Sequence, residues 1–157
     1  MRRNLSIAAA LVVAMAVTGY AQKPDFSGTW TPDQSAAPAG AGGRGMMAGP
    51  MTVTQKGDDL TIERTMGENK MTSTYKLDGT ESVNKMMGRG GEVEVKSTAK
   101  WDGSKLVITT KQPAPDGTVR ESTQTWSLDS GNLTIESTRP GRDGNPMTTK
   151  TVYKKTT

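Results

Sequence analysis

The sequence predicts an all-β protein, with ten antiparallel strands in an up-and-down meander that closes into a barrel. Turn residues recur about every ten residues from position 51 onward, the spacing of short strands joined by tight turns. Between the turns, apolar and polar residues alternate, and Thr and Val are abundant, as on pleated surfaces. Such a meander leaves two edges unpaired unless it closes, which favours a barrel over the alternative, a flattened two-sheet β-sandwich.

The expected strands follow one another with short connections, except after the first. That strand covers 25–31, and residues 33–50 behind it are mostly Gly, Ala, Met and Pro, which predicts a long disordered loop. The clearest alternation lies in 92–101, where the odd-numbered residues are apolar apart from Ser97. The remaining strands are expected at 51–55, 59–65, 70–77, 81–85, 105–112, 118–128, 132–138 and 147–154.

Residues 1–21 have the three parts of a cleavable secretory signal peptide. Two arginines give a positive start, and Ile7–Val17 is an uncharged apolar run, shorter than the about 20 residues of a membrane-spanning helix. Gly19–Ala21 then offers the small residues that a signal peptidase reads. We therefore expect an exported chain, periplasmic or extracellular, with no membrane span and with one domain at 22–157.

The composition argues against several kinds of site. The chain has no Cys and no His, which removes disulfides, the usual general base and the commonest metal ligands. Its formal charge of +4 falls by two with the signal peptide and is scattered, which does not favour nucleic acid. The acidic pairs Asp58-Asp59 and Glu92/Glu94 fit a solvated surface better than glycosidase chemistry. We predict no catalytic residue, no metal, no cofactor, no nucleic-acid partner and a monomer.

Two clusters rich in Gly, Arg and Met stand out, at 42–47 and 86–91. Thioethers are soft ligands that suit Cu(I), but without His or Cys the ligand set is weak. Flexible Met-rich loops also suit adaptable apolar contacts with a partner. The clusters therefore keep open an alternative role, that of an envelope interaction protein that presents these loops.

Two segments resemble a known superfamily. Phe26–Trp30 (FSGTW) resembles the Gly-x-Trp opening strand of the lipocalin and fatty-acid-binding protein superfamily, the calycin-type β-barrels, and Val152–Lys155 (VYKK) resembles the closing strand of fatty-acid-binding proteins. The DFSGTW-like start also resembles that of exported bacterial proteins of unassigned function. The resemblance implies a barrel that holds one small ligand. In that family an Arg holds the fatty-acid carboxylate, and alignment on Tyr153 puts Thr151 in its place, while residues 33–50 do not favour the family's two-helix lid.

We predict a non-catalytic protein that binds a small apolar or amphipathic ligand, and a hydrolytic enzyme is a further alternative, although no Ser has a recognisable nucleophile context. Trp30 either plugs one barrel end or lines the cavity. Hydroxyls should share the inner face with the apolar residues, so the interior should be partly wet; they are Ser73, Ser97, Thr110 and Ser137. The candidates for lining a ligand cavity are Trp30, Met71, Tyr75, Val93, Val95, Leu106, Ile108, Thr151 and Tyr153.

Overall fold

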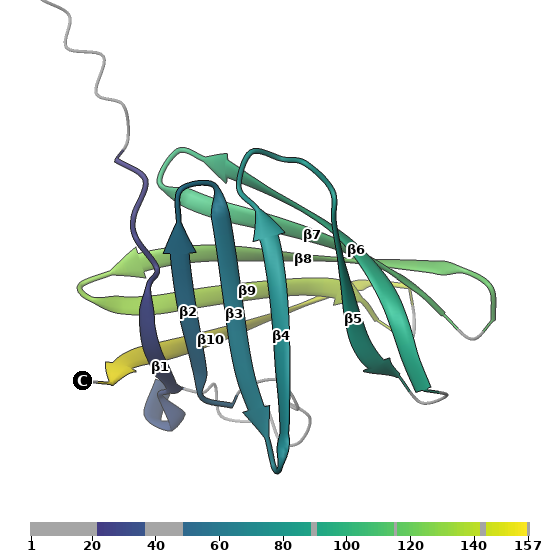
Figure 1. Ribbon diagram of the computed structural model, residues 1–157, viewed down its shortest axis with the longest axis horizontal. Coiled ribbons are helices and arrows are strands. Elements are labelled where there is room, and N and C mark those ends of the chain that lie inside the picture. Colours follow the sequence, from purple (N-terminus) through teal and green to yellow (C-terminus); the bar gives the residue numbers. More distant parts are fainter. Residues whose placement is uncertain (1–21, 37–48, 89–90, 115, 142–143, 157) are drawn as a thin grey trace, which may run out of the picture.

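The computed structural model describes residues 22–36, 49–88, 91–114, 116–141 and 144–156. Its strands form one antiparallel sheet in the order β4-β3-β2-β1-β10-β9-β8-β7-β6-β5, which curls into a nearly closed barrel (Figure 1). The predicted all-β barrel is confirmed. The strands are β1 (Gly28–Pro32), β2 (Met51–Lys56), β3 (Asp59–Met66), β4 (Asn69–Lys76), β5 (Ser82–Gly88), β6 (Gly91–Asp102), β7 (Lys105–Pro113), β8 (Val119–Asp129), β9 (Asn132–Pro140) and β10 (Pro146–Thr156).

Local turn chemistry sets the register of the hairpins. The β8–β9 turn has positive φ at both central residues, Ser130 (50°) and Gly131 (82°), which is the backbone of a type I′ turn. That turn type has the twist of the strands that it joins, so Asp129 pairs directly with Asn132. Because such signals are local, the observed strand bounds lie within a few residues of those expected from the sequence.

The start of the domain differs from the expected first strand at 25–31. The carboxylate of Asp25 accepts a hydrogen bond from the backbone N–H of Ser27 at 2.8 Å, which turns the chain before β1. Gly28 then takes a φ of 143°, a conformation that L side chains rarely adopt. The strand therefore begins at Gly28, and Phe26 folds onto the barrel as a fully buried side chain.

The expected loop at 33–50 is described only at its two ends. Its first residues form a short 3-10 helix, η1 (Gln34–Ala36), and the carboxylate of Asp33 accepts hydrogen bonds from the N–H and hydroxyl of Ser35. The backbone N–H of Asp33 also donates to the carbonyl of Val152 on β10, at 2.7 Å. Residues 37–48, with the first Gly-Arg-Met cluster, lie outside the described residues, as does the predicted signal peptide.

The connections alternate between the two ends of the barrel because neighbouring strands are antiparallel. We call one the aromatic end: it carries Phe26 and the β2–β3, β4–β5, β6–β7 and β8–β9 connections. The polar end carries the connections β1–β2, β3–β4, β5–β6, β7–β8 and β9–β10. The hydrophobic core consists of Phe26, Trp30, Met51, Val53, Leu60, Ile62, Leu77, Ala99, Leu106, Ile108, Trp126, Leu133, Ile135 and Tyr153.

Phe26 organises the aromatic end. Its ring stacks on Trp101 with centroids 5.8 Å apart and meets Trp126 edge to face at 5.7 Å. Its carbonyl accepts a hydrogen bond from the indole N–H of Trp30 at 2.9 Å, and Trp30 is 1% exposed. The residues of the FSGTW motif therefore hold this end of the barrel closed.

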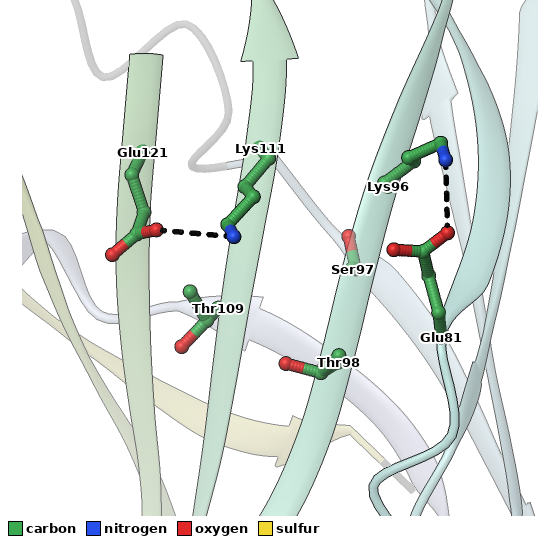
Figure 2. Close-up of a pocket in the computed structure, with 7 residues that line it drawn as sticks. All are labelled: Glu81, Lys96, Ser97, Thr98, Thr109, Lys111 and Glu121. Atoms are coloured by element: carbon green, nitrogen blue, oxygen red, sulfur yellow. Dashed lines mark ion pairs between the residues drawn. The ribbon is translucent and has the colours of Figure 1, made fainter. Parts of the chain in front are cut away.

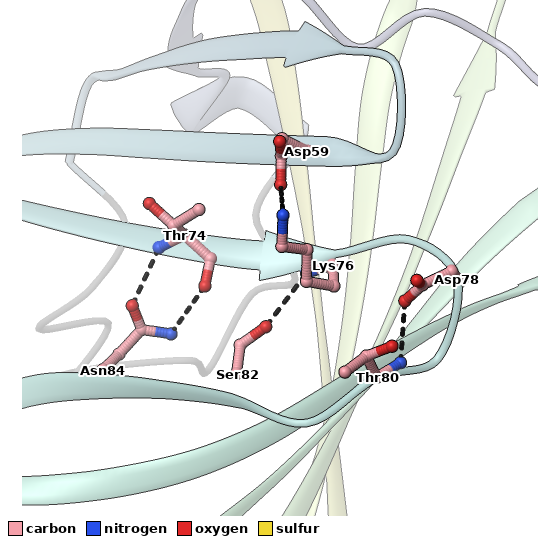
Figure 3. Close-up of polar contacts among 7 residues, drawn as sticks. All are labelled: Asp59, Thr74, Lys76, Asp78, Thr80, Ser82 and Asn84. Atoms are coloured by element: carbon pink, nitrogen blue, oxygen red, sulfur yellow. Dashed lines mark hydrogen bonds and ion pairs between the residues drawn. The ribbon is translucent and has the colours of Figure 1, made fainter.

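The barrel is not closed by a backbone ladder between β4 and β5, which are the two ends of the strand order. Side chains of β5 bridge this seam instead (Figure 3). The Asn84 carboxamide accepts from the Thr74 N–H at 2.8 Å and donates to the Thr74 carbonyl at 3.0 Å. The Ser82 hydroxyl accepts from the Lys76 N–H at 3.0 Å. Asn84 thus replaces one residue of the missing partner strand, which explains how an amide can be 92% buried at an inner position.

The outer surface carries cross-strand ion pairs between exposed side chains. Lys70 contacts Glu63 at 2.8 Å and Lys85 contacts Glu92 at 2.8 Å, and all four side chains are exposed. Pairs of this kind contribute little to stability, typically about 0–1 kcal/mol. Among the described residues, no helix is long and apolar enough to cross a membrane.

Candidate functional site

All nine residues predicted to line a ligand cavity occupy inward positions of the register. They divide into two groups by burial. Met71, Tyr75, Val93 and Thr151 are half-buried, whereas Trp30, Val95, Leu106, Ile108 and Tyr153 are buried. Four of the buried five also belong to the hydrophobic core, so their side chains pack against protein. Contact of any of the nine with a ligand stays a prediction.

Hydroxyls accompany these residues on the inner face, as the alternation predicts. Ser97 and Thr110 are cross-strand partners, and their side-chain oxygens share a hydrogen bond of 2.9 Å. Ser73 pairs with Ile62, and Ser137 pairs with Gln124, whose amide oxygen accepts from the indole N–H of Trp126. Ser97, Thr110 and Ser137 lie farther from the aromatic end than the core residues of their own strands. The inner face therefore changes from apolar to mixed along the barrel.

Arg64 brings a positive charge to the inner face near the polar end. The alternation that points Leu60 and Ile62 inward also points Arg64 inward, and the side chain is half-buried. Its cross-strand neighbours are Met51 on β2 and Met71 on β4. Nη2 donates a hydrogen bond of 3.6 Å to the thioether sulfur of Met51, which is a weak acceptor. Nε is buried without a hydrogen-bond partner in the described part of the chain.

Two tyrosines lie within electrostatic reach of this guanidinium. Burial raises the pKa of the Tyr153 phenol, and the charge of Arg64 partly opposes that shift. Burial also raises the pKa of Tyr75, against a hydrogen bond with Ser73 and the charge of Arg64. Tyr153 is 3% exposed, and its hydroxyl makes no hydrogen bond with the described residues. Arg64 and Tyr153 therefore lie close together, and of their side-chain polar atoms only Nε of Arg64 is buried without a partner among the described residues.

No described carboxylate balances the charge of Arg64 from inside the barrel. The acidic residues of the strands hold outward positions, as Glu63 does beside Arg64 and Glu94 does on β6. The ion pairs among the described residues all use lysines, and none includes Arg64. Asp143 is the one acidic residue outside the described ranges.

Two shallow pockets open on the outer surface. The first, of about 160 Å³, is framed by two exposed ion pairs, Lys96–Glu81 and Lys111–Glu121, with Thr98 and Thr109 between them (Figure 2). The second, of about 310 Å³, lies over β8 and β9 beside the β9–β10 connection. The charged side chains of the first pocket are paired with one another and exposed to solvent. The pocket therefore holds no unpaired charge that would favour a ligand. Among the described residues, no cluster of three or more acidic side chains could hold a metal ion.

No family model matches the chain, and no curated protein matches it. Several solved structures are similar to it. One is zebrafish ileal bile acid-binding protein complexed with cholic acid, with a TM-score of 0.59 and 21% identity over 83% of this chain and 98% of that chain. Another is a fatty acid transporter, REP1-NXSQ, with a TM-score of 0.57 and 16% identity over 83% and 96% of the two chains. Human cRBP IV has a TM-score of 0.56 and 20% identity over 85% and 99%.

These likenesses show the fold. The chain has the nearly closed, ten-stranded barrel of the calycin-type proteins, which the FSGTW and VYKK segments indicated. Thr151 lies half-buried on the inner face beside Ile135. Among the described inward positions, a half-buried guanidinium lies on β3, at Arg64.

Sequence reasoning missed two residues of the interior. A signal for Arg64 was present, because Leu60 and Ile62 define the inward parity of β3 and Arg64 continues it. For Asn84 there was no local signal, because its role depends on β4 and β5 being neighbours without a backbone ladder.

Proposed function

We propose that this protein is an exported, non-catalytic binding protein that holds one small amphipathic molecule inside its barrel. The proposal rests on one observation, which is that the burial and polarity of the inner face change between the polar end and the aromatic end. Toward the polar end, Met71, Met86 and hydroxyls such as that of Thr110 are half-buried, while Phe26, Trp30 and Trp126 at the aromatic end are buried. An inner face of mixed polarity suits a guest with both an apolar and a polar part.

The fold comparisons support this proposal by analogy. One similar structure was solved as a complex with cholic acid, and another similar protein is a fatty acid transporter. Met71 and Met86 are half-buried on the inner face, and methionine side chains rearrange readily around a guest.

A blocking substitution tests where the ligand binds. A neutral polarity-sensitive dye such as Nile red is titrated into the exported protein and into two variants of β4. Ser73→Trp adds bulk at an inward, half-buried position, and Thr72→Trp adds it at the adjacent exposed one. We expect the first variant to weaken dye binding about tenfold or more, equivalent to about 1.4 kcal/mol, and the second to leave it unchanged. Equal binding by both variants would place the dye outside the barrel.

Export is tested by the mass of the protein recovered from its host. The small residues at positions 19 and 21 predict that the exported chain starts at Gln22. A recovered chain that retains residues 1–21 would contradict the proposed localisation.

A second candidate function, an interaction protein, is favoured by one observation. Val83 and Met87 lie on the outer face of β5 and are 54% and 80% exposed, which is unusual for large apolar side chains so close together. Native mass spectrometry of the protein from its own host separates the two functions. A co-purifying small molecule supports ligand binding, and a stoichiometric co-purifying protein supports this alternative.

A further inference from the structure

We propose that the free edge of β4 near the polar end binds an extended segment of another polypeptide as an added strand. This inference is independent of ligand binding inside the barrel, because it concerns main-chain groups at the β4–β5 seam. It gives the second candidate function, an interaction protein, a defined contact surface.

The hydrogen bonds of Thr74 show which main-chain groups of β4 face the seam. Its N–H and its carbonyl both bond to the side-chain amide of Asn84, so they take no part in the ladder with β3 (Figure 3). Successive residues of a strand turn their main-chain groups to opposite edges, so those of Lys70, Thr72 and Lys76 face the seam as well. The N–H of Lys76 confirms this, because it donates to a β5 hydroxyl at 3.0 Å.

Lys70 and Thr72 continue this edge toward the polar end. Their seam-facing N–H and carbonyl groups make no hydrogen bond with the described residues, and β4 and β5 diverge toward that end (Figure 1). Both residues are exposed, so a partner can reach them. Each one offers a donor and an acceptor on the same edge, which is the pattern that the main chain of another strand complements.

The contact of Asn84 indicates what chemistry this edge accepts. A carboxamide has a donor and an acceptor like those of a peptide group. The one on Asn84 makes with Thr74 the pair of hydrogen bonds that a residue of a partner strand would make, at 2.8 and 3.0 Å. Toward the polar end, an extended peptide can supply the same groups to Thr72 and Lys70, because alternate residues of a strand face the same edge.

The side chains beside the open edge favour an uncharged, partly apolar peptide. Met87 on the outer face of β5 is 80% exposed, and Met71 and Met86 are half-buried on the inner face. The outward lysines Lys70 and Lys85 are already paired with acids on β3 and β6. Lysines along an edge disfavour pairing between two copies of that edge, so the partner is a different polypeptide.

Hydrogen exchange of single amides, followed by NMR, tests the edge directly. The probe is a capped six-residue peptide of alternating Thr and Val, added to the exported protein. In the free protein, the amides of Lys70 and Thr72 should exchange fast, and those of Met71 and Ser73, which bond to β3, slowly. Peptide at ten times its Kd should slow exchange at Lys70 and Thr72 by about tenfold and leave Met71 and Ser73 unchanged.

Two variants of Thr72 show whether the main chain carries the binding. Thr72→Pro removes the edge N–H, which a strand tolerates where that N–H is outside the ladder. We expect it to weaken binding of the fluorescently labelled peptide about fivefold or more, equivalent to about 1 kcal/mol. Thr72→Val changes the same side chain but keeps the N–H, and it should bind within about twofold of the native protein. Cooperative thermal unfolding of both variants verifies that they fold.

A modified peptide gives a test that needs no variant of the protein. The same peptide with every amide N-methylated cannot form a main-chain ladder and should not bind. Equal binding of the methylated peptide, or unchanged exchange at Lys70 and Thr72, would overturn the inference. Nile red titration separates this result from the proposed function. Dye binding without peptide binding overturns the edge site alone, and peptide binding without dye binding overturns ligand binding inside the barrel alone.

Discussion

The aromatic end and the polar end of the barrel are built from the same strands but are stabilised by different means. On β8, Trp126 is fully buried against Phe26, whereas Ser122, which lies two inward positions closer to the polar end, is half-buried. On β4, Met71 is half-buried near the polar end, and Leu77, which follows the strand at the aromatic end, is 4% exposed. The comparison shows that large apolar side chains are buried mainly at one end, whereas the inner face near the other end carries half-buried polar groups.

This division has an energetic basis. Burial of large apolar side chains is the main favourable term in folding, and it is concentrated where Phe26 contacts Trp101 and Trp126. At the polar end, the buried Nε of Arg64 has no hydrogen-bond partner among the described residues, which costs free energy. The apolar packing at the aromatic end offsets that cost.

The largest expected effect comes from truncating the aromatic end. Trp126→Ala should lower the free energy of unfolding by about 3–5 kcal/mol, because it removes a buried ring and leaves a cavity. Ser122→Ala, on the same strand toward the polar end, should change it by about 0.5 kcal/mol or less. Urea unfolding followed by fluorescence of the remaining tryptophans measures both. Similar losses in the two variants would mean that the ends do not differ in stability.

The β4–β5 seam should give an intermediate effect. Asn84→Ala leaves the N–H and carbonyl of Thr74 without their partners, which should cost about 1–3 kcal/mol of unfolding free energy. Hydrogen exchange should accelerate at the amides of Thr74 and Lys76 before it does in β7 or β8. Asn69→Ala, an exposed change on the facing strand β4, is the control. If exchange along β4 stays unchanged in Asn84→Ala, the seam is closed by other contacts.

The smallest expected effect is the pH dependence that comes from Asp33 at the polar end. Hydrogen bonds from Ser35 and Lys154 hold the pKa of Asp33 at about 2, below its ordinary 3.8. Because the pKa is lowered in the folded protein, this contribution to stability is complete above about pH 4 and is lost as the pH falls toward 2. Thermal unfolding between pH 5 and 2 should show a dependence in the native protein that is reduced in Asp33→Asn. The same dependence in both would assign it to other carboxylates.

The sequence by itself determined the order of the strands, nearly all of their bounds and the side chains that face inward. These features depend on alternation and turn chemistry, which act over a few residues, so Val93, Leu106 and Tyr153 could be assigned to the inner face without any knowledge of their neighbours.

The tertiary structure decided what those inner positions do. Arg64 has an inward parity that can be read locally, but the absence of a carboxylate partner for it among the described residues follows from the outward acids of the other strands. Asn84 and Phe26 likewise acquire their roles from residues that the chain brings together only on folding, across the seam and at the aromatic end. Alternation specifies which way a side chain points, whereas long-range packing specifies whether it meets a partner, a closed core or solvent.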